Sequence, residues 1–84
     1  MRYEVHLVRS AEKELDHLPL AIHNRILRRI ISLEENPRPR GVKKLSGREE
    51  YRLRVGDYRI LYIIDDGLNL VTISGIGHRR EVYD

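Results

Sequence analysis

The end of the chain, GIGHRREVYD, combines side chains that can move protons with side chains that carry a permanent positive charge. His78 can exchange a proton near neutral pH. Tyr83 has an ordinary pKa of about 10, which nearby cations lower because they stabilise the phenolate. Arg79 and Arg80 can stabilise the extra negative charge of a phosphate under attack. These are the residue types needed for acid–base chemistry on a phosphate ester.

A second group of arginines lies in YRLRVGDYRI, which predicts two strands joined by a tight turn. A two-residue turn at Gly56-Asp57 pairs Arg54 with Arg59 and places Arg52 on the same face of the sheet. Like charges directly opposite each other repel, at a cost of about a few tenths of a kcal/mol or more. We therefore expect an anion between them, either a carboxylate such as Asp57 or Glu50 or a bound phosphate.

Together the two groups could cleave RNA through its own 2′-hydroxyl. A base would remove the 2′ proton, cations would hold the phosphate, and an acid would protonate the leaving 5′ oxygen. This chemistry needs neither a metal nor a cofactor. The sequence offers no convincing metal cluster, because it has no cysteine and its four histidines lie apart at positions 6, 17, 23 and 78.

The first half of the chain predicts one strand and two helices. Residues 2–8 alternate as in a strand, and apolar residues at helical spacing predict a short helix over 11–18 that Ser10 can cap. Pro19 either ends this helix or starts the next one. A longer helix over 19–36 carries an apolar stripe wide enough to cover a sheet. The stripe consists of Ile22, Ile26, Leu27, Ile30, Ile31 and Leu33.

The second half predicts three strands. Residues 37–47 form a basic connection rich in proline and glycine, and strands follow over 50–55, 58–64 and 68–76, with turns at Gly56-Asp57 and Asp66-Gly67. The order β-α-α-β-β-β predicts a single α+β domain over residues 1–84, with a mostly antiparallel sheet and a helical hairpin on one face.

Composition narrows the classes of protein. There is no cysteine, no apolar run of the roughly 20 residues that a membrane helix needs, and no signal-peptide pattern, so we expect a soluble, cytoplasmic protein with no membrane partner. The net charge is +3, and arginine outnumbers lysine 13 to 3. Residues 37–60 hold eight basic and three acidic side chains. This excess favours a polyanionic partner over a merely solvated loop.

An apolar patch accompanies the arginines. In simple register Leu61, Ile63, Leu68 and Leu70 share their face, and nothing else in the sequence covers them. An uncovered apolar patch beside a cationic one predicts a protein partner as well as an anion.

The stretches KKLSG, YRLRVGDYRILYII and GHRREVY resemble the RelE branch of the RelE/ParE toxin superfamily, over nearly the whole chain. The resemblance implies a small RelE-like fold and a toxin of a type II toxin–antitoxin system. Such a toxin enters the ribosomal A site and cuts mRNA there. The resemblance also implies a cognate acidic, RelB-like antitoxin that wraps the toxin in a hetero-oligomer, and the apolar patch would bind it.

The resemblance further implies a role for each matching residue. Arg59 would contact the scissile phosphate, Arg79 would assist the leaving group or stabilise charge, and Tyr83 would be the general base. Because an arginine is a poor proton donor, we expect His78 to act as the acid. The residues that would bind RNA are Arg52 and Arg54 on the mRNA backbone and Lys43, Lys44 and Arg80 on ribosomal RNA.

Two alternatives stay open. A ParE-like toxin shares this scaffold and inhibits DNA gyrase, although HRREVY disfavours it because that branch lacks the tail site. A non-catalytic module would use the same arginines only to bind RNA or an acidic protein.

Overall fold

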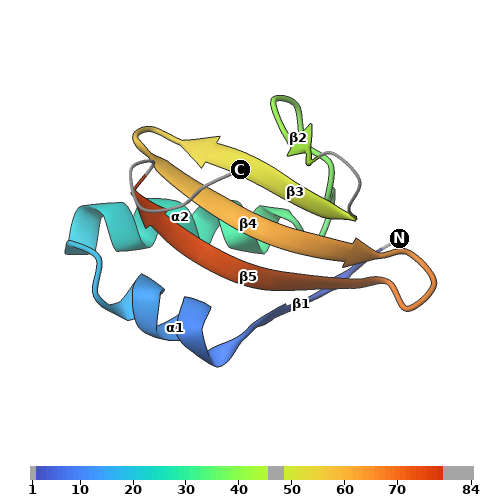
Figure 1. Cartoon of the computed structure of the whole chain (residues 1–84), viewed down its shortest axis with the longest axis horizontal. Coiled ribbons are helices and arrows are strands. Elements are labelled where there is room, and N and C mark those ends of the chain that lie inside the picture. Colours follow the sequence, from blue (N-terminus) through green and yellow to red (C-terminus); the bar gives the residue numbers. More distant parts are fainter. Residues whose placement is uncertain (1, 46–48, 79–84) are drawn as a thin grey trace.

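Two helices cover one face of a five-stranded sheet in the computed structural model, which describes residues 2–45 and 49–78 (Figure 1). The strands lie in the order β1-β5-β4-β3-β2; β1 runs parallel to β5, and the other neighbours are antiparallel. The predicted α+β architecture, with a mostly antiparallel sheet and the helices on one face, is confirmed. The elements are β1 Glu4–Leu7, α1 Arg9–Asp16, α2 Leu20–Ser32, β2 Lys43–Lys44, β3 Glu50–Val55, β4 Tyr58–Asp65 and β5 Leu70–His78.

The helices form where expected, but their bounds differ from the prediction: α1 ends at Asp16 and not at residue 18, and α2 ends at Ser32 and not at residue 36. α1 begins at Arg9 after an extended Val8, and no side chain caps it. The predicted cap Ser10 is wrong, because Ser10 already lies in the first turn of the helix. Pro19 occupies the cap position of α2, where its missing N–H costs no helical hydrogen bond.

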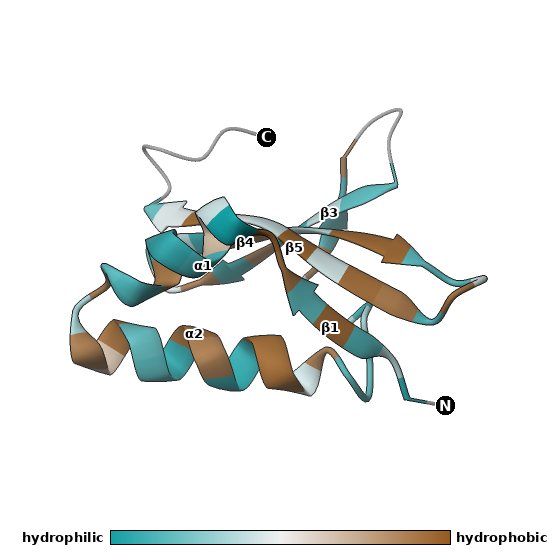
Figure 2. Ribbon diagram, turned by 90° about the horizontal axis from the view of Figure 1, so that it is seen from below, coloured by the Kyte–Doolittle hydropathy of each residue, from teal (hydrophilic) through white to brown (hydrophobic). Residues whose placement is uncertain are grey.

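The core lies between α2 and the sheet. Ile26 and Leu33 of the α2 side are fully buried, as are Ile60 and Ile73 of the sheet. Figure 2 shows α2 alternating between hydrophobic and hydrophilic segments along its length, as an amphipathic helix does. The predicted stripe is wrong only at Ile31, which is 51% exposed, because one residue beyond Ile30 the helix has turned by about 100°.

The predicted register of the β3–β4 hairpin is confirmed. Val55 pairs with Tyr58, Arg54 with Arg59, and Arg52 with Leu61. Gly56 has a φ of 61°, in the left-handed region that glycine adopts without steric cost.

The sequence predicts an irregular connection over 37–47, but Lys43–Lys44 pairs with β3 and forms the strand β2. Lys43 lies opposite Arg52, and Lys44 lies opposite Tyr51. Two consecutive lysines carry no alternating pattern, so only their pairing with a neighbouring strand reveals this element.

β5 starts later and ends later than the predicted strand over 68–76. Leu68 lies in the β4–β5 turn, where its backbone N–H donates to Asp65 Oδ1 at 3.1 Å. β5 begins at Leu70 and includes His78, so this histidine belongs to the sheet.

Arg38 ties the α2–β3 connection to the β4–β5 turn. Its Nη1 and Nη2 donate to the two carboxylate oxygens of Asp66 at 3.2 and 2.8 Å, and its Nε donates to the Tyr51 hydroxyl at 3.2 Å. The Tyr3 hydroxyl donates to Asp66 Oδ1 at 2.7 Å. The hydrogen bonds from Arg38 and then Tyr3 lower the pKa of the Asp66 carboxyl. This network holds the start of the basic connection in place.

Candidate functional site

Three arginines gather on the sheet face that the helices leave uncovered, as the hairpin pattern predicts. Arg54 and Arg59 lie directly opposite each other on β3 and β4, and Arg52 lies two residues before Arg54 on the same face. The pairing of Lys43 with Arg52 adds a fourth cation to this face. We call Lys43, Arg52, Arg54 and Arg59 the cationic face.

The surroundings of Arg52 disfavour its charged form. Arg52 is 7% exposed, although it stands on the face without helices. Burial, and then the positive charges of Arg59 and Arg54, lower the pKa of the Arg52 guanidinium. An anion bound here would relieve this mutual repulsion.

Lys44 is not part of the cationic face. Its register partner Tyr51 belongs to the core, so the β2 backbone directs Lys44 to the opposite side from Lys43. Its Nζ lies 3.4 Å from Glu49 Oε1.

A β-bulge decides on which face His78 lies. β4 pairs Leu61 with Gly75 but Tyr62 with Ile73, so Ser74 is an extra residue in β5. In uninterrupted register His78 would share the face of the arginines. The extra residue reverses the alternation beyond it, because side chains in a strand alternate with a period of two.

His78 therefore lies opposite Tyr58, on the side that the helices cover, while Gly77 lies opposite Arg59. The rings of Tyr58 and His78 meet edge to face with their centroids 5.4 Å apart. The sequence predicts a strand that ends at residue 76 and a tail that acts together with the arginines, but the structure keeps His78 in β5 and does not bring it together with them. Its role as a proton donor stays a prediction.

The other expected tail residues lie outside the described residues. They are Arg79, Arg80 and Tyr83.

The predicted apolar patch is confirmed in part. Leu61, Ile63 and Leu70 stand on the same face as the arginines: Leu61 and Leu70 are half-buried, and Ile63 is 42% exposed. Leu68 is 71% exposed but lies in the turn, so the strand alternation does not place it on this face.

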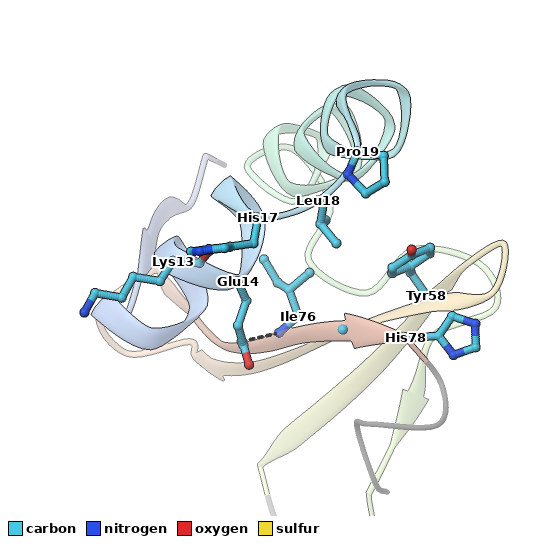
Figure 3. A pocket seen from close by; sticks show the side chains of 9 residues that line it. Lys13, Glu14, His17, Leu18, Pro19, Tyr58, Ile76 and His78 are labelled. Atoms are coloured by element: carbon cyan, nitrogen blue, oxygen red, sulfur yellow. Dashed lines mark hydrogen bonds between the residues drawn. The ribbon is translucent and has the colours of Figure 1, made fainter.

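A groove that the sequence did not reveal lies on the helix side, between α1, the α1–α2 corner and the paired ends of β4 and β5 (Figure 3). Glu14 and His17 of α1 line one side, and Tyr58 and His78 line the other. Residues so far apart in the chain give no local signal, and only the fold brings them together.

No group of three or more His, Cys, Asp or Glu side chains in residues 2–45 and 49–78 is arranged to hold a metal ion. Within that same part of the chain, no helix is long and apolar enough to cross a membrane.

The sequence and the fold match a class of small toxins. The family model described as "ParE toxin of type II toxin-antitoxin system, parDE" matches residues 5–83, and the chain belongs to this RelE/ParE superfamily of toxins. Within the superfamily its relatives carry the name RelE. A Methanocaldococcus jannaschii protein named as the toxin RelE1 is 29% identical over 87 residues, which cover 99% of this chain and 97% of that one.

Solved structures of RelE toxins share the fold of this chain. The RelE–RelB complex of Pyrococcus horikoshii matches with 33% identity and a TM-score of 0.85, over 98% of this chain and 100% of the matched chain. The RelBE2 toxin–antitoxin complex of Mycobacterium tuberculosis matches with 30% identity and a TM-score of 0.83, over 94% and 100% of the two chains. A mutant of Escherichia coli RelE in the free state is 23% identical with a TM-score of 0.82, over 96% and 87%, and shows the shared fold.

Proposed function

We propose that this RelE-like toxin is a ribosome-dependent mRNA endoribonuclease. The observation that carries the proposal is the cross-strand pair of Arg54 and Arg59 beside the buried Arg52. Such a concentration of guanidinium groups suits the phosphate backbone of a nucleic acid. The resemblance of the sequence to RelE toxins implies RNA as that nucleic acid and the cytoplasmic ribosome as the place of action.

In the proposed reaction the 2′ oxygen attacks the adjacent phosphorus, and the bond from phosphorus to the 5′ oxygen breaks. The products are a 2′,3′-cyclic phosphate and a 5′-hydroxyl. Tyr83 takes the 2′ proton, while Arg59 and Arg54 stabilise the charge that develops on the phosphate. Arg79 stabilises the leaving oxygen, and His78 is the proton donor to be tested. The step requires no metal ion or cofactor.

The deciding experiment maps cleavage of one mRNA in the same Mg²⁺-containing buffer, with translating ribosomes in one arm and without ribosomes in the other. A further arm without ribosomes contains EDTA. Wild type should cut only in the presence of ribosomes, and a 2′-deoxy nucleotide at the cut position should abolish cleavage. Tyr83→Phe should lower the rate by about 10² or more, within the usual range for a general base. Cleavage that survives the 2′-deoxy substitution would eliminate this mechanism, and an unchanged rate in Tyr83→Phe would eliminate that residue as the base.

His78 is tested separately, because the fold directs it away from Arg59. In His78→Gln, loss of the basic limb of the pH–rate profile would establish proton donation, since an acid must be protonated to act. An unchanged profile with a lower rate at every pH would show that His78 acts only through its packing on Tyr58.

A gyrase-inhibiting activity is the second candidate, since the matching family model is that of ParE. Inhibition of DNA supercoiling by the purified chain, without cleavage of translated mRNA, would decide for it.

We also propose that an acidic, RelB-like antitoxin neutralises the toxin by covering the uncovered face of the sheet. The P. horikoshii and M. tuberculosis relatives were solved as toxin–antitoxin complexes. Here the apolar patch lies beside the cationic face, so one partner can bury Ile63 and pair with the arginines. An acidic protein encoded next to the toxin gene is the partner to test.

Ile63→Glu should weaken antitoxin binding about tenfold or more in a calorimetric titration, because it places a charge in an apolar contact. Ile31→Glu is the matched control, since Ile31 is 51% exposed on α2. Equal affinities of both variants and wild type would remove the open face as the binding surface.

A further inference from the structure

Glu14 links helix α1 to the last part of strand β5, although Glu14 and Ile76 are 62 residues apart in the sequence. Glu14 Oε1 accepts the backbone N–H of Ile76 at 2.9 Å, as the dashed line in Figure 3 shows. A hydrogen bond to an ionised carboxylate is roughly twice as strong as one between neutral groups. The proposed cleavage of RNA does not use this carboxylate directly, so its function is open.

The hydrogen bond lies where β5 loses its neighbouring strand. β1 ends at Leu7, which lies opposite Ile73, and in the described part of the chain no strand pairs with β5 on that side beyond Ile73. The edge of a sheet presents backbone N–H groups that have no partner in the ladder. Glu14 supplies the acceptor that a longer β1 would have supplied to Ile76.

The stretch around Ile76 offers little side-chain surface that packing could hold. Gly75 and Gly77 flank Ile76, and Ile76 alone of these three contributes a side chain to the core, where it is 1% exposed. Helix α1 packs against β5 and is itself anchored in the core by Ala11 and Leu15. The hydrogen bond from Ile76 therefore fixes the backbone of this stretch to an anchored helix.

This end of β5 lies next to the cationic face, because Gly77 pairs with Arg59. The proposed cleavage uses Arg79 and Tyr83, which follow His78 in the sequence. The position and direction of β5 at His78 therefore set the point from which the chain continues to both residues.

We propose that Glu14 is a positioning residue of the endoribonuclease. Its hydrogen bond to Ile76 fixes the end of β5 and thereby places Tyr83 for its attack on the RNA whose phosphate Arg59 binds. This inference rests on the proposed function. A misplacement of about 1 Å, caused far from the reacting atoms, can slow a reaction by about 10². Loss of this hydrogen bond should therefore slow the chemical step and leave the binding of ribosomes unchanged.

The first test needs no catalysis and measures hydrogen exchange of backbone amides by NMR in the free chain. In Glu14→Ala the Ile76 amide should exchange about tenfold faster than in wild type, because the hydrogen bond that protects it is lost, while amides of the β3–β4 hairpin keep their rates. Glu14→Gln should stay close to wild type, since its amide oxygen can accept the same N–H. Glu12→Ala removes a carboxylate from an exposed position of α1 and is the control. An unchanged exchange rate of Ile76 in Glu14→Ala would overturn the proposal, whether or not the chain cuts mRNA.

The second test measures mRNA cleavage at a temperature well below the Tm of every variant, with translating ribosomes as the varied substrate. Glu14→Ala should lower kcat about tenfold and leave KM unchanged, and Glu14→Gln should restore most of the rate. Ala11→Gly is the matched stability control and should keep the wild-type kcat, because it weakens α1 through helix propensity without removing the carboxylate. If wild type cuts and Glu14→Ala has the same kcat, or if Ala11→Gly loses as much as Glu14→Ala, the proposal is wrong while the proposed function stands. A wild-type chain that does not cut translated mRNA would instead remove the proposed function itself.

The third test combines Glu14→Ala with Tyr83→Phe. If Glu14 acts by placing Tyr83, the combined loss of kcat should be smaller than the product of the two separate losses, because the position of a side chain without its hydroxyl matters less. A combined loss equal to that product would show that the two residues act independently, and Glu14 would then have no positioning role.

Discussion

Arg54→Gln should make the free protein more stable and should slow the proposed cleavage of mRNA. Arg54 lies directly opposite Arg59, and its charge also disfavours the charged form of the buried Arg52. Removing one charge from a cross-strand pair of like charges should raise the free energy of unfolding by about 0.2–1 kcal/mol. Because Arg54 is exposed, we expect an increase of roughly 0.5 kcal/mol. For a domain of this size, that corresponds to a rise in Tm of about 2–4 °C.

The assay is thermal unfolding of the RNA-free chain at low and at high ionic strength. The gain should be largest in dilute buffer and should shrink in 1 M salt, where the screening length is about 3 Å. Arg28→Gln removes the same charge from an exposed position on α2 and should bring no gain. In the ribosome assay Arg54→Gln should cut about tenfold more slowly or worse, because it holds the phosphate less well.

Two results would refute this reasoning. A lower Tm for Arg54→Gln would mean that Arg54 is held by favourable contacts in the free protein. If the increase in Tm of Arg54→Gln over wild type stays the same at high salt, charge repulsion is not its cause.

Two further predictions concern the stability of the fold. The pKa of Asp66 is lowered in the folded chain, so its contribution to stability is present at neutral pH and is lost as the pH falls from about 4 through the lowered value. Asp66→Asn should therefore be less stable than wild type at pH 7. Over this acid range the Tm of Asp66→Asn should fall less than that of wild type. Gly56→Ala should lower the free energy of unfolding by about 1 kcal/mol in a denaturant titration, because φ is 61° and the new Cβ would lie 3.2 Å from Arg25 Nη1. Gly75→Ala is its control and should cost less, since its Cβ would meet Leu61 Cδ1 at an ordinary 3.7 Å.

The sequence predicts the β3–β4 hairpin and its arginine pair correctly for a local reason. A two-residue turn and a period of two fix the register between them, so the pairing of Arg54 with Arg59 follows from Gly56-Asp57 alone. The amphipathic stripe of α2 is equally local, because Ile26 and Ile30 recur at the helical period. The cationic face could therefore be predicted, apart from Lys43, before any tertiary contact was known.

The position of His78 could not be predicted in this way. Whether it joins the arginines depends on a single extra residue, Ser74, in the pairing of β4 with β5. The bulge lets both Ile73 and Ile76 face the core, where they are 0% and 1% exposed, although three residues separate them. Burial of these two side chains outweighs regular pairing, and that balance involves α1, α2 and both strands at once.

The sequence by itself determined the chemistry available to this toxin and the face on which its arginines stand, because both depend on residue type and short-range periodicity. Only the tertiary structure decided that His78 turns toward Tyr58, that Lys43 joins the arginines, and that Glu14 and His17 border a groove beside them. Each of these depends on segments far apart in the chain packing against one another, which local patterns do not encode.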